Sequence, residues 1–348
     1  MENNYFIFTK KDRPLTLKRF HICSWEFING SAIIEFGGEI SHSDIFKNDE
    51  LTISFYIPWI AKKHKVNDLY DSLKESENCK FIFNDSVIGN KFLDNGQRKD
   101  GVIQEFIERN SLCIIPITSE INEVGRLLTV TVNLKPYKEN QNIDNPNLYF
   151  RFYIEPDIKN ISTRKLGISR STIIYDVKIN EKRNLPDNSF DLSESRLCEI
   201  KSCFCFNILP NSYDLTFFDA GALKNIRTLE FDSFKKYIKD KRVKKDELVV
   251  VFNKKDNKES YSFFSIFSKE RIGAGQFALA VFVNLICGIL LFFPSYRNTQ
   301  TEKFFALKFW SDLPLEVYLA ISVGIIILVY FFWPKLIMPF KWNVKKAN

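Results

Sequence analysis

Histidine is the scarcest reactive residue of this chain, with only His21, His42 and His64 among 348 residues. Imidazole is the commonest general base and a common metal ligand near neutral pH, so its scarcity argues against acid–base and metal catalysis. The sequence also lacks the G-x-S-x-G, H-E-x-x-H, phosphate-loop and G-x-G-x-x-G patterns. We therefore predict no catalytic residues, no bound metal and no cofactor, and hence a protein that is not an enzyme.

Two small clusters of reactive residues are explained by local structure more simply than by catalysis or metal binding. His42 and Asp44 stand in GGEISHSD, a composition typical of a surface turn, although a catalytic His–Asp pair would need the same residues. Cys198, Cys203 and Cys205 lack a fourth ligand nearby, and Cys203 and Cys205 would lie about 6.6 Å apart along one strand face. We favour a turn for the first cluster and buried structural thiols for the second.

Long apolar runs are confined to the end of the chain. The run from Ile272 to Phe293 contains no ionisable residue, and a 22-residue helix is about 33 Å long, enough to cross a bilayer. A second run extends from Leu313 to Trp333. We predict transmembrane helices at 272–293 and 313–333, an extracytoplasmic connector at 294–312 and a basic cytoplasmic tail at 334–348.

The orientation follows from the flanking segments. The start, MENNYFIFTKKDRP, shows no basic segment followed by an apolar one, so no secretory signal is expected. Basic residues are concentrated before the first span and after the second, and seven unpaired cysteines fit a reducing compartment. These patterns predict an integral protein of the inner membrane with both termini in the cytoplasm.

The residues before the spans are expected to fold mainly as strands. Segments such as Arg126–Lys135 and Leu148–Glu155 are rich in β-branched and aromatic residues, and several alternate between apolar and polar. We predict an antiparallel sandwich or barrel-like body with few helices, divided into a β-rich domain at 1–160 and a second β-rich segment at 161–268. The other expected strands are Phe6–Thr9, Ser31–Phe36, Leu51–Ile57, Lys80–Phe83, Leu112–Thr118, Ser171–Ile179, Leu197–Ile208, Asn225–Phe231, Leu248–Asn253 and Tyr261–Phe267, and the expected helices are Val66–Glu77 and Asp232 to about Lys241.

The densest basic stretch is FKKYIKDKRVKKDE at residues 234–247. Its Lys235, Lys236, Lys239 and Arg242 are candidates for contact with anionic lipid headgroups or a phosphate, because basic residues beside a span are attracted to the membrane surface. The alternative is a solvated helix face. The net charge of +7 leaves only +3 before residue 272, so binding to nucleic acid is not expected.

A second basic group mixes cations with hydroxyl groups in STRKLGISRST. Arg164, Lys165 and Arg170 of this segment suit a phosphate-bearing ligand such as a nucleotide. The alternative is an ordinary exposed loop.

The predicted hairpin contains polar and small residues at packing distances. Asn284 lies in the middle of the first span, where an unpaired amide is costly, and Gly288 follows one turn later. Ala320 and Gly324 have small-x-x-x-small spacing in the second span. These residues predict close packing, either between copies in an oligomeric pore or within a two-helix anchor in which Asn284 bonds to its own second helix.

The layout of a cytoplasmic β-rich body followed by a two-span hairpin resembles in outline the membrane effectors of bacterial anti-phage signalling systems. The resemblance covers the order of the parts and no aligned residues. It implies a sensor–effector: a body that recognises a cytoplasmic protein or nucleotide ligand, and a homo-oligomer that perturbs the bilayer. The alternative is a passive scaffold that holds a protein-binding domain at the membrane.

Overall fold

The computed structural model describes residues 3–45, 49–94, 97–140, 145–167, 170–185, 194–245, 247–270 and 274–299, together with 315, 317–327 and 329. The chain forms two compact units. The first, here called the body, comprises Met1–Leu166 and Thr172–Lys269. The second, the C-terminal unit, comprises Gly167–Ser171 and Glu270–Asn348. The two units are described separately.

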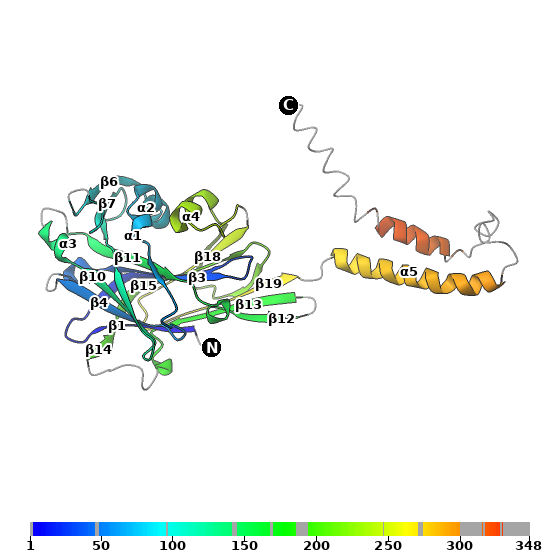
Figure 1. Cartoon of the computed structure of the whole chain (residues 1–348), viewed down its shortest axis with the longest axis horizontal. Helices are drawn as coiled ribbons and strands as arrows, with labels where there is room; N and C mark the ends of the chain where they lie inside the picture. Colours follow the sequence, from blue (N-terminus) through cyan, green and yellow to red (C-terminus); the bar gives the residue numbers. More distant parts are fainter. Residues whose placement is uncertain are drawn as a thin grey trace, which may run out of the picture. The chain divides into compact units, whose positions relative to one another are not determined.

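The body is built mainly from two β-sheets (Figure 1). The first sheet has the order β16-β19-β13-β1-β4-β10-β9, with β12 on β13 and β14 on β1. Its strands are β1 (Asn3–Lys10), β4 (Glu50–Tyr56), β9 (Thr118–Asn122), β10 (Leu127–Asn133), β12 (Thr163–Leu166), β13 (Arg170–Ile179), β14 (Ser195–Leu197), β16 (Asp214–Phe218) and β19 (Tyr261–Glu270).

The second sheet has the order β17-β18-β15-β2-β3-β11-β8-β7-β6, with β5 on β11. Its strands are β2 (Thr16–Glu26), β3 (Ala32–Ile40), β5 (Val66–Asp68), β6 (Val87–Phe92), β7 (Val102–Phe106), β8 (Leu112–Ile114), β11 (Asn147–Ile154), β15 (Glu199–Pro210), β17 (Leu223–Thr228) and β18 (Leu248–Asp256). The helices of the body are α1 (Tyr70–Leu73), α2 (Ser76–Phe83), α3 (Lys135–Glu139) and α4 (Phe231–Ile238), with short 3-10 turns η1 (His42–Asp44), η2 (Ile158–Asn160) and η3 (Lys182–Asn184).

The sheets pack face to face through aromatic side chains. Phe55 of the first sheet has its ring centroid 5.4 Å from that of Phe152 and 5.9 Å from that of Phe36 in the second sheet. These side chains belong to one continuous core of buried residues. In β10 the expected alternation is found, with Leu128, Val130 and Val132 buried while the intervening threonines are partly exposed. The prediction of a mainly β body is therefore confirmed.

The sheets are mixed, whereas an antiparallel arrangement was expected. The pairs β1–β13, β2–β15 and β8–β11 run parallel. Two of these pairs join strands from before residue 160 to strands from after it. The stretches 1–160 and 161–268 thus both contribute strands to both sheets.

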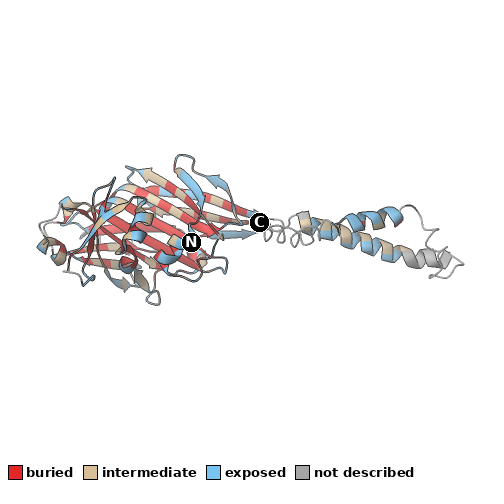
Figure 2. Ribbon diagram, turned by 90° about the horizontal axis from the view of Figure 1, so that it is seen from above, coloured by how far each residue is buried: buried red, intermediate tan, exposed pale blue. Residues whose placement is uncertain are grey.

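A second buried cluster covers the outer face of the second sheet. Helices α1, α2 and α4 lie over this face, where Trp25 and Phe106 pack with Phe234 and Tyr237 of α4. Strand β2 is consequently buried from Phe20 to Glu26, and Figure 2 shows buried residues running along the strands of the body. Its sequence shows no clean alternation because both of its faces are covered, and for this reason no strand was predicted there.

Two local predictions are wrong. The segment expected as a helix, Val66–Glu77, contains β5, α1 and the beginning of α2, and Lys80–Phe83, expected as a strand, lies in α2. The chain changes from strand to helix at Asp68, whose carboxylate accepts a hydrogen bond from the N–H group of Tyr70 at 2.9 Å in a turn between the end of β5 and the start of α1. Helix α4 confirms the other expected helix, although it ends at Lys239 in a left-handed conformation (φ 56°).

In the C-terminal unit, α5 extends over Ala274–Thr299. Within it, Gly275–Phe292 is long and apolar enough to cross a membrane, and a shorter apolar helix covers Val317–Ile327. Helix α5 continues past Phe293, so the first helix is longer than predicted. Of the second predicted span, 313–333, only its central part is described; the remainder of the connector from residue 300 and the tail 334–348 lie outside the described residues.

Candidate functional site

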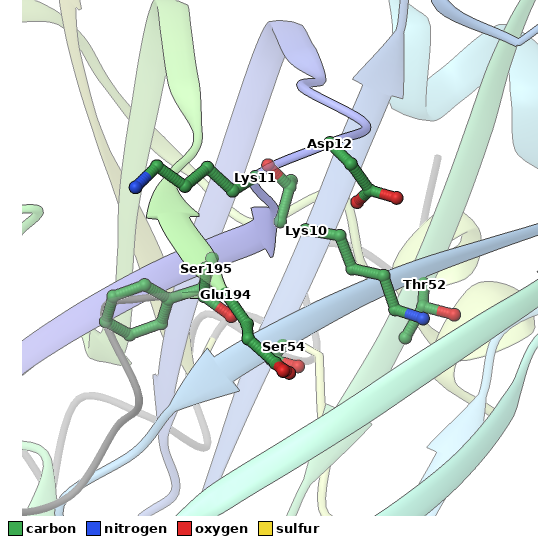
Figure 3. A pocket seen from close by; sticks show the side chains of 9 residues that line it. Lys10, Lys11, Asp12, Thr52, Ser54, Glu194 and Ser195 are labelled. Atoms are coloured by element: carbon green, nitrogen blue, oxygen red, sulfur yellow. The ribbon is translucent and has the colours of Figure 1, made fainter.

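A groove lies on the outer face of the first sheet, beside the turn that follows β1 (Figure 3). Its volume is about 710 Å³. A second hollow of about 430 Å³ shares Lys10, Asp12 and Thr52 with it. The first hollow is lined by Phe8, Thr9, Lys10, Lys11, Asp12, Thr52, Ser54, Glu194 and Ser195.

Strand alternation places the hydroxyl groups in this groove. In β4, Leu51, Ile53 and Phe55 belong to the core between the sheets, so Thr52 and Ser54 face the other way. Ser54 lies opposite Phe8 of β1, and Ser195 of β14 lies opposite Lys10. Lys10 and Thr52 point toward one another, whereas Lys11 extends in another direction (Figure 3).

The groove is suited to polar binding. Lys10 and Lys11 supply cations, Asp12 and Glu194 supply carboxylates, and four hydroxyl-bearing side chains line the groove with them. None of the described lining residues is a histidine or a cysteine, so the serines have no neighbouring general base of the usual kind. The groove can therefore hold a ligand through hydrogen bonds and charges of both signs, but the described lining contains no nucleophile–base pair.

His42 and Asp44 lie in a single 3-10 turn, η1, as the turn interpretation expected. They contact different partners. The Nδ1 atom of His42 is 2.9 Å from the hydroxyl oxygen of Tyr137. The Asp44 carboxylate accepts a hydrogen bond from the backbone N–H group of Thr16 at 2.9 Å. Each side chain thus fastens the turn to a different strand or helix.

The three clustered cysteines are buried and free, and Cys203 and Cys205 lie in the core between the sheets. Burial raises the pKa of the Cys205 thiol to about 12, so it stays protonated. A protonated thiol is a poor metal ligand, and no group of three His, Cys, Asp or Glu side chains within the described residues is placed to hold a metal ion.

Of the three residues predicted to bind a phosphate, one is held in an ion pair and two are accessible. Arg164 is ion-paired with the fully buried Glu26 at 2.5 Å, and Ser162 also donates to that carboxylate. Lys165 and Arg170 are exposed and have no ion pair within the described part of the chain. Arg164 therefore anchors β12 to the second sheet, while its two neighbours remain accessible.

Some basic side chains of the stretch around α4 also have contacts within the chain. Lys236 forms an ion pair with Glu77 at 3.3 Å, and Lys235 lies 5.0 Å from the ring centre of Phe231. Lys236 and Lys239 line a hollow of about 660 Å³ together with Glu75 and Glu77 of the α2 region, so acidic groups share that hollow with them.

The guanidinium of Arg242 is held by contacts within the body. It forms ion pairs with Asp240 at 2.5 Å and with Glu155 at 3.1 Å, and its guanidinium stacks 4.7 Å from the ring centre of Phe27. These contacts tie the loop after α4 to the turn between β2 and β3 and to the end of β11. Few donors of Arg242 remain for a ligand.

Sequence reasoning missed a buried polar network between the second sheet and α4. Glu35 of β3 is 0% exposed and accepts hydrogen bonds from Trp25 Nε1 at 2.5 Å, Arg151 Nε at 2.7 Å and Tyr237 Oη at 3.0 Å. Burial opposes the charge of Arg151, but Glu35 and the adjacent phenols outweigh it and hold its pKa above the ordinary value. A charged residue in an otherwise apolar strand, as in AIIEFGGEI or LYFRFYI, was the available signal.

His21 lies on the same face of the second sheet. Its Nδ1 atom is 2.9 Å from Tyr149 Oη, and that hydroxyl fits because Gly37 has no side chain: a Cβ there would lie 2.8 Å from it. Burial and the nearby arginines Arg151, Arg19 and Arg109 lower the pKa of His21 well below its usual value. His21 is therefore neutral at pH 7 and serves the packing of the sheet.

The polar and small residues of the predicted hairpin lie on different faces. Gly324 is buried, and a Cβ at this position would lie 3.6 Å from the ring of Phe282, so the second helix packs closely on α5 there. Ala320 lies one turn earlier and is partly buried. Asn284 and Gly288 are both exposed, and Asn284 is two residues, or about 200° around the helix, from Phe282.

No protein-family model matches this chain, and a search of curated proteins finds no match.

Proposed function

We propose that the chain is a membrane-anchored sensor–effector, whose body recognises a cytoplasmic protein or nucleotide ligand and whose hairpins associate to perturb the membrane. The setting suggested by the order of its parts is bacterial anti-phage defence. The groove beside β1, with lysines, carboxylates and hydroxyl groups, is the candidate recognition site on the body.

One observation carries the effector part of the proposal. Asn284 is exposed in the middle of an apolar helix, on the side away from Phe282, and its side chain makes no hydrogen bond to any described residue. An amide facing lipid is unfavourable unless it finds a hydrogen-bond partner. Because the described part of the second helix lies on the other side of α5, the nearest suitable partner is Asn284 of another copy. Gly288, one turn later, allows the backbones of two helices to approach.

The alternative, a passive membrane-tethered scaffold, also has a supporting observation. The contact of Gly324 with Phe282 gives the hairpin an internal packing surface, which is sufficient for a stable anchor. In that case the body alone would retain partner binding, and changes at Asn284 that preserve insertion would be harmless.

The two functions differ in a measurement of membrane potential. Cells expressing the wild-type chain at increasing levels, followed with a potential-sensitive dye, are expected to depolarise, while cells with equal amounts of inserted Asn284→Leu are expected to keep their potential. Val283→Leu, a conservative change at the neighbouring exposed position, is the matched control and should behave as wild type. Cells that stay polarised at every level of inserted wild-type protein would leave the scaffold as the better description.

A further inference from the structure

One lateral side of the sandwich is formed by two neighbouring edge strands. Among the described strands, β16 is the last of the first sheet at this side and β17 is the last of the second. A short turn joins them, in which the backbone N–H groups of Ala222 and Leu223 donate to the carbonyl oxygen of Asp219. Leu215 of β16 and Leu223 of β17 pack on the same apolar cluster between the sheets. The two edges therefore belong to one surface of the body.

The chain reverses its direction between these two strands. Asp214, the first residue of β16, follows closely after the end of β15, where Pro210 lies opposite Leu248 of β18. Thr228, the last residue of β17, lies opposite Val249, the next residue of β18. The start of β16 and the end of β17 are thus at the same end of the sandwich, so the two strands run antiparallel.

This surface exposes apolar side chains. All exposed phenylalanines of the described body belong to β16 or to its neighbour β19: Phe217 is 53% exposed, Phe218 39% and Phe264 37%. The rings of Phe217 and Phe264 contact each other with centroids 5.7 Å apart. Ile226 of β17 lies opposite Val251 of the apolar cluster and so points toward the space between the sheets, yet it is 47% exposed. Exposed apolar side chains on a sheet edge are a surface on which another chain can pair.

The charges of the two edges are complementary. Strand β16 has Asp214 at its start and contains no basic residue. Strand β17 carries Lys224 and Arg227, both exposed, and the side chain of Arg227 remains 45% accessible although it contacts Glu230. Two β17 edges side by side would bring like charges together, which is unfavourable, and two β16 edges would leave β17 uncovered. One edge of each kind fits the other.

The edges at the opposite side of the sandwich are protected by other means. Strand β9 is polar and carries Glu120, and β6 carries Lys91 and has a bulge before Gly89. Charges and bulges on an edge strand hinder its pairing with another chain. Strand β16 also has a bulge, between Leu215 and Phe217, so binding at this edge depends on side chains more than on a long ladder of backbone hydrogen bonds.

We infer that the β16–β17 surface of the body binds the same surface of a second copy of the chain. A two-fold axis parallel to the strands and between the sheets places β16 of each copy beside β17 of the other. Since β16 and β17 are antiparallel within one chain, each pair between the copies is antiparallel as well, and Asp214 of one copy lies toward Arg227 of the other. The second copy covers Phe217 and Ile226. This contact involves the body alone and is additional to the proposed association of the hairpins.

The test is mixed cross-linking of the full chain in detergent. One preparation carries Thr216→Cys and a size tag, and the other carries Asn225→Cys, both in a Cys287→Ser background because the other described cysteines are buried. A short bis-maleimide is expected to link the two chains in the mixture and to give little dimer in either preparation alone. The linked product should persist when both chains carry Asn284→Leu, which distinguishes this contact from association of the hairpins.

Substitutions on the two edges test the chemistry of the contact. Phe217→Ser together with Ile226→Ser is expected to lower the yield of linked product about tenfold. The control is Ile88→Ser, at an exposed apolar residue of the β6 edge, which should leave the yield unchanged. Asp214→Lys in the Thr216→Cys chain should lower the yield several-fold, and Arg227→Glu in the Asn225→Cys chain should restore it.

Three results would overturn the inference. Absence of linked product in the mixture, with both chains unfolding at the wild-type denaturant concentration, would exclude the contact. Dimers of the Thr216→Cys chain alone, at the yield of the mixture, would replace the reciprocal arrangement by pairing of two β16 strands. Loss of the linked product with Asn284→Leu would assign association to the hairpins and leave the proposed function intact.

Discussion

Glu35 and Asn284 are both polar side chains placed among apolar ones, and their surroundings differ. Glu35 is enclosed in the body and receives hydrogen bonds from β2, β11 and α4. The side chain of Asn284 stands on the surface of an apolar helix without a hydrogen bond to any described residue. A buried polar group is unfavourable unless it is paired. Glu35 finds its partners within the chain, so it specifies which segments of one molecule meet. For Asn284 we propose a partner in another copy, so that it would specify which molecules meet.

The largest effect is expected from breaking the enclosed pair. Arg151→Met removes the cation whose guanidinium lies 2.6 Å from Glu35 and leaves a buried carboxylate without its counter-charge. We expect the free energy of unfolding of the body to fall by about 3–5 kcal/mol, measured by denaturant titration of Trp fluorescence. Arg183→Met, at an exposed pair with Glu181, should change it by less than about 0.5 kcal/mol. A loss below about 1 kcal/mol for Arg151→Met would show that Glu35 does not depend on this pair.

A smaller effect is expected from detaching α4. Tyr237→Phe removes one hydrogen bond to a buried carboxylate, which is worth about 1.5–3 kcal/mol, and hydrogen exchange in α4 should accelerate more than in β10. Tyr153→Phe is the control, because the hydroxyl of Tyr153 donates no hydrogen bond within the described residues. Uniform acceleration of exchange throughout the body would mean that α4 does not open separately.

The pH dependence tests whether His21 is enclosed as a neutral group. Its pKa is lowered in the folded state from about 6.5 in the unfolded state, so unfolding takes up a proton below pH 6.5 and stability falls as the pH decreases. At pH 5.5 the loss should be about 1.4 kcal/mol relative to His21→Gln. Asp68, whose pKa is raised to about 6 by burial, acts in the opposite direction, and comparison with the variant cancels its contribution. If the free energy of unfolding changed with pH equally in the wild type and in His21→Gln, His21 would not be a buried neutral group.

The smallest effect is expected at Asn284, because hydrogen bonds between membrane helices are worth about 0.6 kcal/mol on average. The exposed Cys287 is three residues away on the same face and reports on that contact. Copper-catalysed oxidation of membranes should give a Cys287-linked dimer whose yield falls several-fold with Asn284→Leu and disappears with Cys287→Ser. Gly324→Leu, on the face toward Phe282, should leave the yield nearly unchanged. An undiminished yield of the Cys287-linked dimer in Asn284→Leu would show that association does not depend on Asn284.

The strands that sequence predicts best are those with one covered face. Strand β10 was predicted because Leu128, Val130 and Val132 alternate with threonines, whereas β2 was missed because helices cover its second face and remove the alternation. The segment Lys80–Phe83 was predicted as a strand because a short apolar run does not distinguish a strand from one turn of a helix.

The candidate sites show a similar limit. The basic groups were found from composition, but the occupied state of Arg164 depends on Glu26, 138 residues earlier in the chain. The groove beside β1 was not predicted, since Lys10, Thr52 and Ser195 come together only through the pairing of three distant strands. Asn284 was predicted as a notable residue, but which face of the hairpin it occupies required the position of Phe282.

The long reach of the polar network also affects synthesis of the protein. Glu35 and Tyr237 are 202 residues apart in the chain. At about 5–20 residues per second, a ribosome needs roughly 10–40 s to make the second after the first. Throughout that interval Glu35 lacks the hydroxyl group of Tyr237, and β18 of the same sheet is made later still. The apolar helix α5 then begins only a few tens of residues after Tyr237, so the body closes at nearly the same moment as this helix is made. A nascent chain of this kind gains most from a chaperone that holds its early strands until α4 and β18 are made.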